Sequence, residues 1–347
     1  MLTSKKQFLV LIVIALSVGL TSGVIGAVSS QNYLDRYAAS LELYGDRFMK
    51  LSEQKPRALP GTYEEAVSKT RETVSPSVAR FYKGNAEAYL PGAESSLVVV
   101  VTSDGWILTG FETIEGDAPL RVFIGQDAYT VIDYVADPMT GTAMVRVAGS
   151  GLTVIAFGAS DAVESGDLAF AAVGQTGILP TAIVDADNWI AKSAINSSEQ
   201  FTSAFLLADA APLFGTAVVN TLGELIAIDA TPLHQILPFV KSVIRSGQNT
   251  RPTLGVMVMD LSRAAVGETI SRGFDRGAYV SAVTNGSAAA AGGVKKGDII
   301  IDLNGAVLSS RATLAEFLTA YNPGDRVTLS IDRAGEEMEI TVELGSK

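Results

Sequence analysis

The stretch FLLADAAPLFGTAVVNTLGELIAID, residues 205–229, decides how the middle of this chain is expected to fold. It opens with an apolar run, passes through a loop, and enters a second apolar run at the letters GTAVVN. A turn is predicted at Leu222 and Gly223, and the run LIAID then forms a further strand. Short apolar runs between turn signals are typical of buried β-strands. The stretch therefore predicts part of an all-β domain.

The same pattern extends over residues 62–247, the predicted middle domain. Runs rich in Val, Ile and Ala, such as SSLVVVVTS, GWILTG and APLRVFIG, alternate with Gly, Asp, Asn and Pro turns. Many short strands at close spacing favour a β-barrel or a β-sandwich. A helix is expected at each end, in TYEEAVSKTRETV and in PLHQILPFVKSVIRSG.

Composition excludes several classes of protein. Of the 347 residues, 48% are apolar and 18% are charged, which argues against wholesale disorder. The net charge is −11, so no nucleic-acid partner is expected. The chain contains no cysteine and a single histidine, His234. Disulfides, thiolate sites and zinc sites with several His ligands are therefore excluded, and neither a metal nor a cofactor is predicted.

Residues 1–30 are predicted to direct the chain to a membrane. Lys5 and Lys6 precede the uncharged run 8–28, FLVLIVIALSVGLTSGVIGAV. At about 1.5 Å per residue this run is long enough for a hydrocarbon core of roughly 30 Å. The lysines favour a cytoplasmic N-terminus, which places the bulk of the chain outside the cytoplasm. A cleaved signal peptide with its apolar core at 8–20 is the alternative, and it also implies export.

Residues 31–61 are predicted to form a helical stalk followed by a linker. The stalk carries apolar residues at alternating spacings of three and four, which is the pattern of a coiled-coil seam: Leu34, Tyr37, Leu41, Tyr44, Phe48 and Leu51. Self-association is one interpretation, and an amphipathic helix packed on its own domain or on a membrane surface is the other. Pro56, Pro60 and Gly61 then end the helix.

Five segments are similar, in their order along the chain, to segments of the HtrA-type, trypsin-like serine proteases. They are VSPSVARFY (74–82), SDGWILTGFETI (103–114), DPMTGTAMVRV (137–147), GTAVVNTLGELIAID (215–229) and TPLHQILPFVKSVI (231–244). The resemblance implies a mainly β fold, with a trypsin-like double β-barrel over residues 62–247. It also places the family's catalytic base and acid in the second and third of these segments, and the nucleophile in the loop just before the fourth.

The triad positions implied by this resemblance hold no triad residues. The base falls on Glu112, the acid on Gly141 and the nucleophile on Phe214. The mechanism needs a hydroxyl nucleophile, an imidazole base and a carboxylate that orients it. Phe and Gly can supply none of these, and Pro212, at an oxyanion-hole glycine position, lacks an N–H. The sequence therefore predicts a catalytically inactive homologue, that is, not an enzyme.

The only histidine does not restore the triad in this interpretation. His234 lies in the closing helix, after the nucleophile loop, whereas the family's base lies far upstream. We predict an ordinary surface or capping histidine. A hydrolase with relocated catalytic residues remains the alternative.

Residues 252–347 resemble the PDZ domain of HtrA proteins, through the run GSAAAAGGVKKGDIIIDLNG and the helix ATLAEFLTAY. A PDZ domain binds an extended peptide as an added strand and holds its terminal carboxylate with backbone N–H groups. The resemblance implies a peptide-binding site formed by a carboxylate loop and one helix face: Thr253, Leu254, Gly255, Val256, Leu314 and Leu318. The two leucines lie one turn apart, so a role in the core is equally compatible with the pattern.

Together these features predict a membrane-anchored HtrA-like pseudoprotease. It would span the cell membrane once, with a cytoplasmic N-terminus, and act in extracytoplasmic protein quality control or regulation. Its expected partners are unfolded polypeptides or protein C-termini, with assembly as a homotrimer or with an active paralogue. Two alternatives remain, an active HtrA-like endopeptidase or hydrolase with relocated catalytic residues and a trimeric membrane scaffold.

Overall fold

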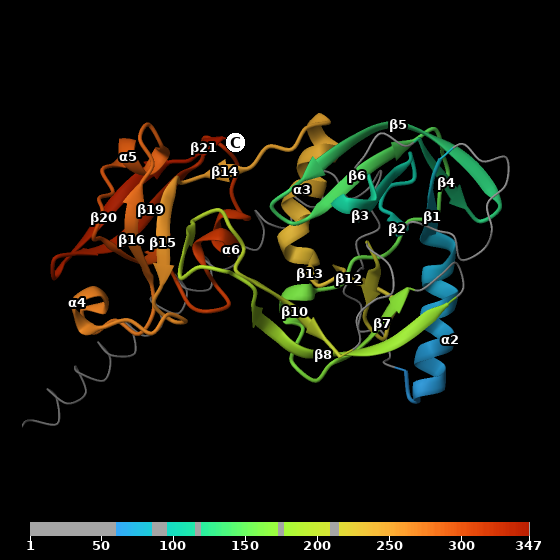
Figure 1. Cartoon of the computed structure of the whole chain (residues 1–347), viewed down its shortest axis with the longest axis horizontal. Coiled ribbons are helices and arrows are strands. Elements are labelled where there is room, and N and C mark those ends of the chain that lie inside the picture. The colour runs from blue at the N-terminus through green and yellow to red at the C-terminus, as the bar shows by residue number, and fades with distance from the viewer. Residues whose placement is uncertain (1–59, 85–95, 115–118, 173–176, 209–214, 347) are drawn as a thin grey trace, which may run out of the picture. The chain divides into compact units, whose positions relative to one another are not determined.

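The computed structural model describes residues 60–84, 96–114, 119–172, 177–208 and 215–346 (Figure 1). The predicted anchor (1–30), the stalk up to residue 59 and Phe214 lie outside the described residues. Within the described ranges, no helix is long and apolar enough to cross a membrane. The transmembrane helix of residues 1–30 therefore stays a prediction.

The chain is mainly β, and its first sheet closes into a barrel in the order β1-β2-β3-β6-β5-β4 (Figure 1). Helix α2 precedes the barrel, and its N-cap Thr62 accepts a hydrogen bond from the Glu65 N–H. The elements are α2 (Tyr63–Val74), η1 (Ser75–Ser77), β1 (Val78–Lys83), β2 (Ser96–Val100), β3 (Trp106–Gly110), η2 (Phe111–Thr113), β4 (Leu120–Ile124), β5 (Asp127–Asp137) and β6 (Thr142–Val147).

Strand β2 is buried on both faces because it separates two cores. Val98 and Val100 pack inside the barrel with Val145. Leu97 and Val99 belong to a second core that the barrel shares with the following sheet and helix α3. Since side chains alternate between the two faces of a strand, a continuous Val run fills both cores at once.

The second half of the middle domain is a curled, six-stranded sheet in the order β10-β8-β7-β11-β12-β13. A hydrogen bond of 2.8 Å from the Phe205 N–H to the Ala230 carbonyl brings its two ends together. The described strands are thus barrel-like without closing into a second full barrel. The elements are η3 (Ser160–Ala162), β7 (Leu168–Ala172), β8 (Ile178–Trp189), β9 (Ile195–Ser197), β10 (Ser203–Leu207), β11 (Ala217–Val219), β12 (Leu225–Ile228), β13 (Thr231–Pro232) and α3 (Leu233–Ser246).

The turn predicted at Leu222 and Gly223 is confirmed. Gly223 has a φ of +76°, and its N–H donates to the Asn220 carbonyl. Helix α3 is also confirmed as the closing helix, with Pro238 inside it and Gly247 as a left-handed C-cap.

The C-terminal residues form an α+β unit whose sheet runs β20-β19-β17-β16-β15, with helices α5 and α6 beside it (Figure 1). Its core is separate from those of the middle domain. The elements are β14 (Pro252–Thr253), β15 (Val256–Asp260), α4 (Glu268–Ser271), β16 (Ala278–Val283), α5 (Ala288–Gly292), β17 (Ile299–Leu303), β18 (Ala306–Val307), α6 (Leu314–Leu318), β19 (Arg326–Arg333), β20 (Glu336–Glu343) and β21 (Gly345–Ser346).

Candidate functional site

The predicted carboxylate loop contains a left-handed turn at Gly255. Gly255 has a φ of +79°, in the left-handed region that favours glycine. A Cβ added there would lie 2.3 Å from the Cβ of Ser287. The resulting turn points the N–H groups of Leu254 and Gly255 at one acceptor. Such paired N–H groups form an anion-binding concavity.

A carboxylate of the chain itself fills that concavity. Oε1 of Glu199 accepts the N–H of Leu254 at 2.9 Å and that of Gly255 at 2.8 Å. The preceding residue is also engaged, since the Ser198 N–H donates to the Val256 carbonyl at 2.9 Å. The Val256 N–H in turn donates to Oγ of Ser198 at 3.3 Å. The loop therefore holds a carboxylate and the residue before it.

Strand β9 continues this contact along the neighbouring strand. It pairs antiparallel with β15, with Ser197 opposite Met257 and Ile195 opposite Met259. The pairing makes β9 the edge strand of the C-terminal sheet, although its residues belong to the predicted middle domain 62–247. The sequence pattern predicts a middle-domain strand in this segment, whereas in the structure β9 pairs with β15 of the C-terminal sheet.

Hydrogen bonding keeps the Glu199 carboxyl ionised. Burial alone would raise the pKa of Glu199, but hydrogen bonds from Ser197, Gly255, Ser198 and Leu254 outweigh it. The pKa consequently lies below its usual value. The group in the loop is a carboxylate at neutral pH, the same species as a polypeptide C-terminus.

The two predicted groove leucines line pockets and also belong to the core. Leu314 and Leu318 are 2% and 3% exposed and pack in the C-terminal core. Leu318 nevertheless lines the larger pocket together with Thr253, and Leu314 lines a smaller one beside Val258. The two interpretations left open by the sequence are therefore compatible with each other.

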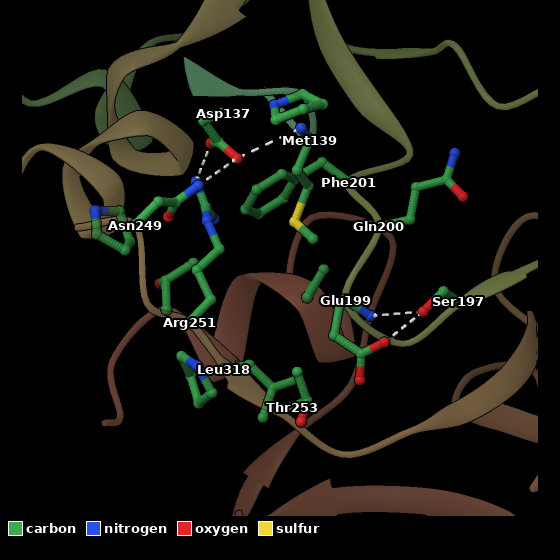
Figure 2. A pocket seen from close by; sticks show the side chains of 15 residues that line it. Asp137, Met139, Ser197, Glu199, Gln200, Phe201, Asn249, Arg251, Thr253 and Leu318 are labelled. Carbon is green, nitrogen blue, oxygen red and sulfur yellow. Dashed lines mark hydrogen bonds and ion pairs between the residues drawn. The ribbon is translucent and has the colours of Figure 1, made fainter. Parts of the chain in front are cut away.

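The larger pocket has a volume of about 480 Å³ and lies next to Glu199. Figure 2 shows Asp137, Asn249 and Arg251 on one side of it and Glu199 with Ser197 on the other. The Arg251 guanidinium is paired with the buried Asp137 carboxylate and lies 5.8 Å from the Phe201 ring centre. Burial lowers the pKa of Arg251, and the Asp137 charge opposes that shift. This pair gives the pocket a neutral, fixed wall.

Of the predicted triad positions, the structure describes Glu112 and Gly141. The segments that carry them meet, since the Phe111 N–H donates to the Gly141 carbonyl at 2.8 Å. Glu112 is exposed in η2, and Gly141 has a φ of +65°. Asp229 lies beside the first of these segments, close to Gly110, and its carboxylate accepts the N–H groups of Gly215 and Thr216. Burial raises the pKa of Asp229, and the charge of Glu112 also raises it.

The single histidine lies in a chain of contacts that the sequence analysis did not predict. Oγ of Ser160 lies 3.0 Å from Nδ1 of His234, and Nε2 of His234 lies 3.4 Å from Oε2 of Glu316. The Ser160 hydroxyl also accepts the backbone N–H of His234 at 2.7 Å, at the first turn of α3. Ser160 and Glu316 lie 74 and 82 positions from His234 along the chain, so no local sequence pattern predicts these contacts. Among the described residues, no group of three or more His, Asp or Glu could hold a metal ion.

The chain resembles known proteins over most of its length. Residues 252–344 match the family model described as PDZ domain. Over 375 residues the chain is 28% identical to the periplasmic pH-dependent serine endoprotease DegQ of Escherichia coli K12, covering 98% of this chain and 78% of that protein. The chain is a homologue of the HtrA-type serine proteases.

Two further matches agree with this HtrA-type assignment. The periplasmic serine endoprotease DegP of Escherichia coli K12 is 27% identical over 272 residues, which cover 73% of this chain and 57% of that protein. The solved structure of the HtrA-type protease AlgW with tripeptide has a TM-score of 0.61 at 22% identity. That alignment covers 81% of this chain and 97% of the solved one, and it shows the shared fold.

These relatives overturn the prediction that the chain is not an enzyme. DegQ and DegP are both named serine endoproteases, so the activity named for the relatives conflicts with that prediction. The prediction rested on an ungapped reading that assigned the triad to Glu112, Gly141 and Phe214.

Proposed function

We propose that this chain is an HtrA-type endopeptidase homologue that binds polypeptide C-termini through its PDZ domain. The proposal rests on the hydrogen bonds that the Leu254 and Gly255 N–H groups donate to a carboxylate, at 2.9 and 2.8 Å. A terminal carboxylate offers the same kind of acceptor, and β15, the strand with which β9 pairs, can hold the rest of the peptide as a strand in place of β9.

The cellular setting is part of the proposal. The relatives DegQ and DegP are named as periplasmic, which supports an extracytoplasmic role in protein quality control. We further propose that residues 1–30 anchor the chain in the membrane and that the heptad of residues 34–51 supports assembly as a trimer. These two points rest on sequence pattern alone.

Binding is tested with a labelled peptide that ends in an apolar residue, prepared with a free and with an amidated C-terminus. Fluorescence anisotropy with the whole chain should show saturable binding of the free acid and much weaker binding of the amide. Equal binding of the two forms would show that the loop does not recognise a C-terminus.

Peptide hydrolysis is the second part of the proposed function. Since His234 is the only histidine of the chain, an imidazole base has to be this residue. The described residues place Ser160 and Glu316 on its two ring nitrogens, the order of nucleophile, base and orienting acid. Ser160 is only 4% exposed, so attack on a substrate through it requires that η3 moves away from α3.

Hydrolysis is tested with unfolded casein and with a fluorophosphonate probe. We expect cleavage and labelling in the wild type, and loss of both in Ser160→Ala. Ser150→Ala, which changes an exposed serine, is the matched control and should behave as the wild type. Labelling that survives in Ser160→Ala would assign the nucleophile to another residue.

A further inference from the structure

The contact at the carboxylate loop has the polarity of a bound C-terminal peptide. In such a peptide an extended strand is followed by the carboxylate. In this chain β9 (Ile195–Ser197) is followed by the carboxylate of Glu199. The strand pairs with β15 and the carboxylate with the loop, so one short segment satisfies both parts of the site.

A second set of contacts holds the segment that leads into β9. The guanidinium of Arg263, which follows β15, is paired with the Asp187 side chain and donates to the Asp187 carbonyl at 3.2 Å. The same guanidinium lies 5.1 Å from the Trp189 ring centre. The segment is thus fixed to the C-terminal unit at both ends, by Glu199 and by Arg263.

We propose that residues 195–199 are an internal ligand that occupies the PDZ groove, and that a polypeptide C-terminus binds by displacing it. The inference rests on the proposed peptide binding and adds its regulation. A tethered ligand competes at a high effective concentration, so the closed groove weakens the apparent affinity for any peptide added from outside. Only C-termini that are abundant or well matched open it.

The internal ligand can be weakened without touching the loop. Glu199→Ala removes the carboxylate and its charge-assisted hydrogen bonds, and should raise the affinity for the free-acid peptide about tenfold. Glu199→Gln keeps one oxygen and should raise it by less. Glu336→Ala removes an exposed carboxylate on β20 and should leave the affinity unchanged. Wild-type affinity in Glu199→Ala would contradict the proposal.

The internal ligand can also be locked, because the chain has no cysteine of its own. Ile195 and Met259 are directly opposed across β9 and β15. Ser198 and Val256 form a hydrogen-bonded pair, because the Ser198 N–H donates to the Val256 carbonyl. Hydrogen-bonded and non-hydrogen-bonded pairs alternate along an antiparallel ladder, so Ile195 and Met259, three positions further along, form a closely spaced, non-hydrogen-bonded pair. Such a pair suits a disulfide. The double variant Ile195→Cys/Met259→Cys is expected to crosslink under mild oxidation.

The oxidised double variant should lose binding of the free-acid peptide, and reduction should restore it. Failure of the crosslink to form would show that β9 does not lie on β15 in solution. Unchanged binding after crosslinking would show that the peptide does not use this groove. The first result overturns the internal ligand and leaves peptide binding at the loop untouched, whereas the second overturns both the displacement and binding at this groove.

Loss of the proposed function gives a different result. If no variant distinguishes the free acid from the amide, peptide binding at the loop fails. Hydrogen exchange of the Leu254 and Gly255 amides then still tests whether residues 195–199 occupy the groove. These amides should exchange faster in Glu199→Ala than in Glu336→Ala, and equal rates would contradict the proposal.

Discussion

Oε1 of Glu199 lies 2.8 Å from the backbone nitrogen of Gly255, so a carboxylate from the middle domain lies where the PDZ domain is built to hold one. Two elements of the fold make this contact possible. The left-handed turn at Gly255 aims the loop, and β9 delivers the carboxylate along the edge of β15. A change at this contact is therefore expected to alter both the stability of the chain and its affinity for peptide.

Replacement of Gly255 by Ala should disable the loop. The new Cβ would meet the Ser287 Cβ at 2.3 Å, and the φ of +79° disfavours any side chain. We expect a loss of about 1–3 kcal/mol in the free energy of unfolding and at least about tenfold weaker binding of the free-acid peptide. Urea unfolding and anisotropy measure the two effects. Gly267→Ala, where a Cβ meets nothing within 4 Å, should change neither.

Removal of the Asp137 carboxylate should strongly destabilise the chain. Asp137 is buried and paired with Arg251, and a buried charge left alone costs about 3–5 kcal/mol. Asp137→Ala tests this by urea unfolding. Asp104→Ala breaks the half-exposed pair with Arg146 at 3.6 Å and should cost about 1 kcal/mol or less. Similar losses in the two variants would show that the pair beside the pocket does not support the fold.

Loss of the Arg263 side chain should loosen the internal ligand from its other end. Arg263→Ala removes the pairing with Asp187 and the stacking on Trp189, so β9 should leave β15 more readily. The free-acid peptide is expected to bind several-fold more tightly, a shift of about 1 kcal/mol. Arg326→Ala, which breaks an exposed pair with Glu343, is the control and should bind as the wild type. Weaker binding in Arg263→Ala would mean that Arg263 serves the peptide instead.

The contribution of Glu199 to stability should disappear in acid. Its pKa is lowered in the folded chain, so its stabilising effect is complete above the usual value of 4.5 and declines as the pH falls through the lower folded value. The pKa of Asp229 is raised, so its ionisation lowers the stability as the pH rises. Asp229 is present in both the wild type and Glu199→Gln, so its effect cancels when the two are compared. Urea unfolding of the wild type and Glu199→Gln should differ above pH 4.5 and converge below it. A difference that grows towards acid pH would contradict this.

The sequence predicted those parts of the fold that local pattern controls. The turn at Gly223 and helix α3 follow from spacing and from glycine chemistry. The peptide-binding role that the PDZ resemblance implies for the loop around Gly255 stays a prediction. The pairing of β9 with β15 was not predictable in this way. A strand's partner depends on which edge is free in the folded chain, and Ile195 and Met259 are 64 positions apart.

The contacts of the site could not be predicted from the sequence for the same reason. Glu199 precedes Gly255 by 56 positions, and Ser160 precedes His234 by 74. A short polar run such as Ser197-Ser198-Glu199 is indistinguishable from a solvated loop until its neighbour is known. The error about activity had another origin, because it was inferred only from the residue types at the ungapped positions Glu112, Gly141 and Phe214, and the activity named for the relatives conflicts with it.

The most direct test of the account compares free-acid and amidated forms of one apolar-ended peptide on the Glu199→Ala chain, by fluorescence anisotropy. With the internal carboxylate removed, Leu254 and Gly255 are predicted to bind the free acid at least about tenfold more tightly than the amide, because only the acid supplies a charged acceptor. Equal affinity for the two forms would contradict the claim that this loop captures polypeptide C-termini.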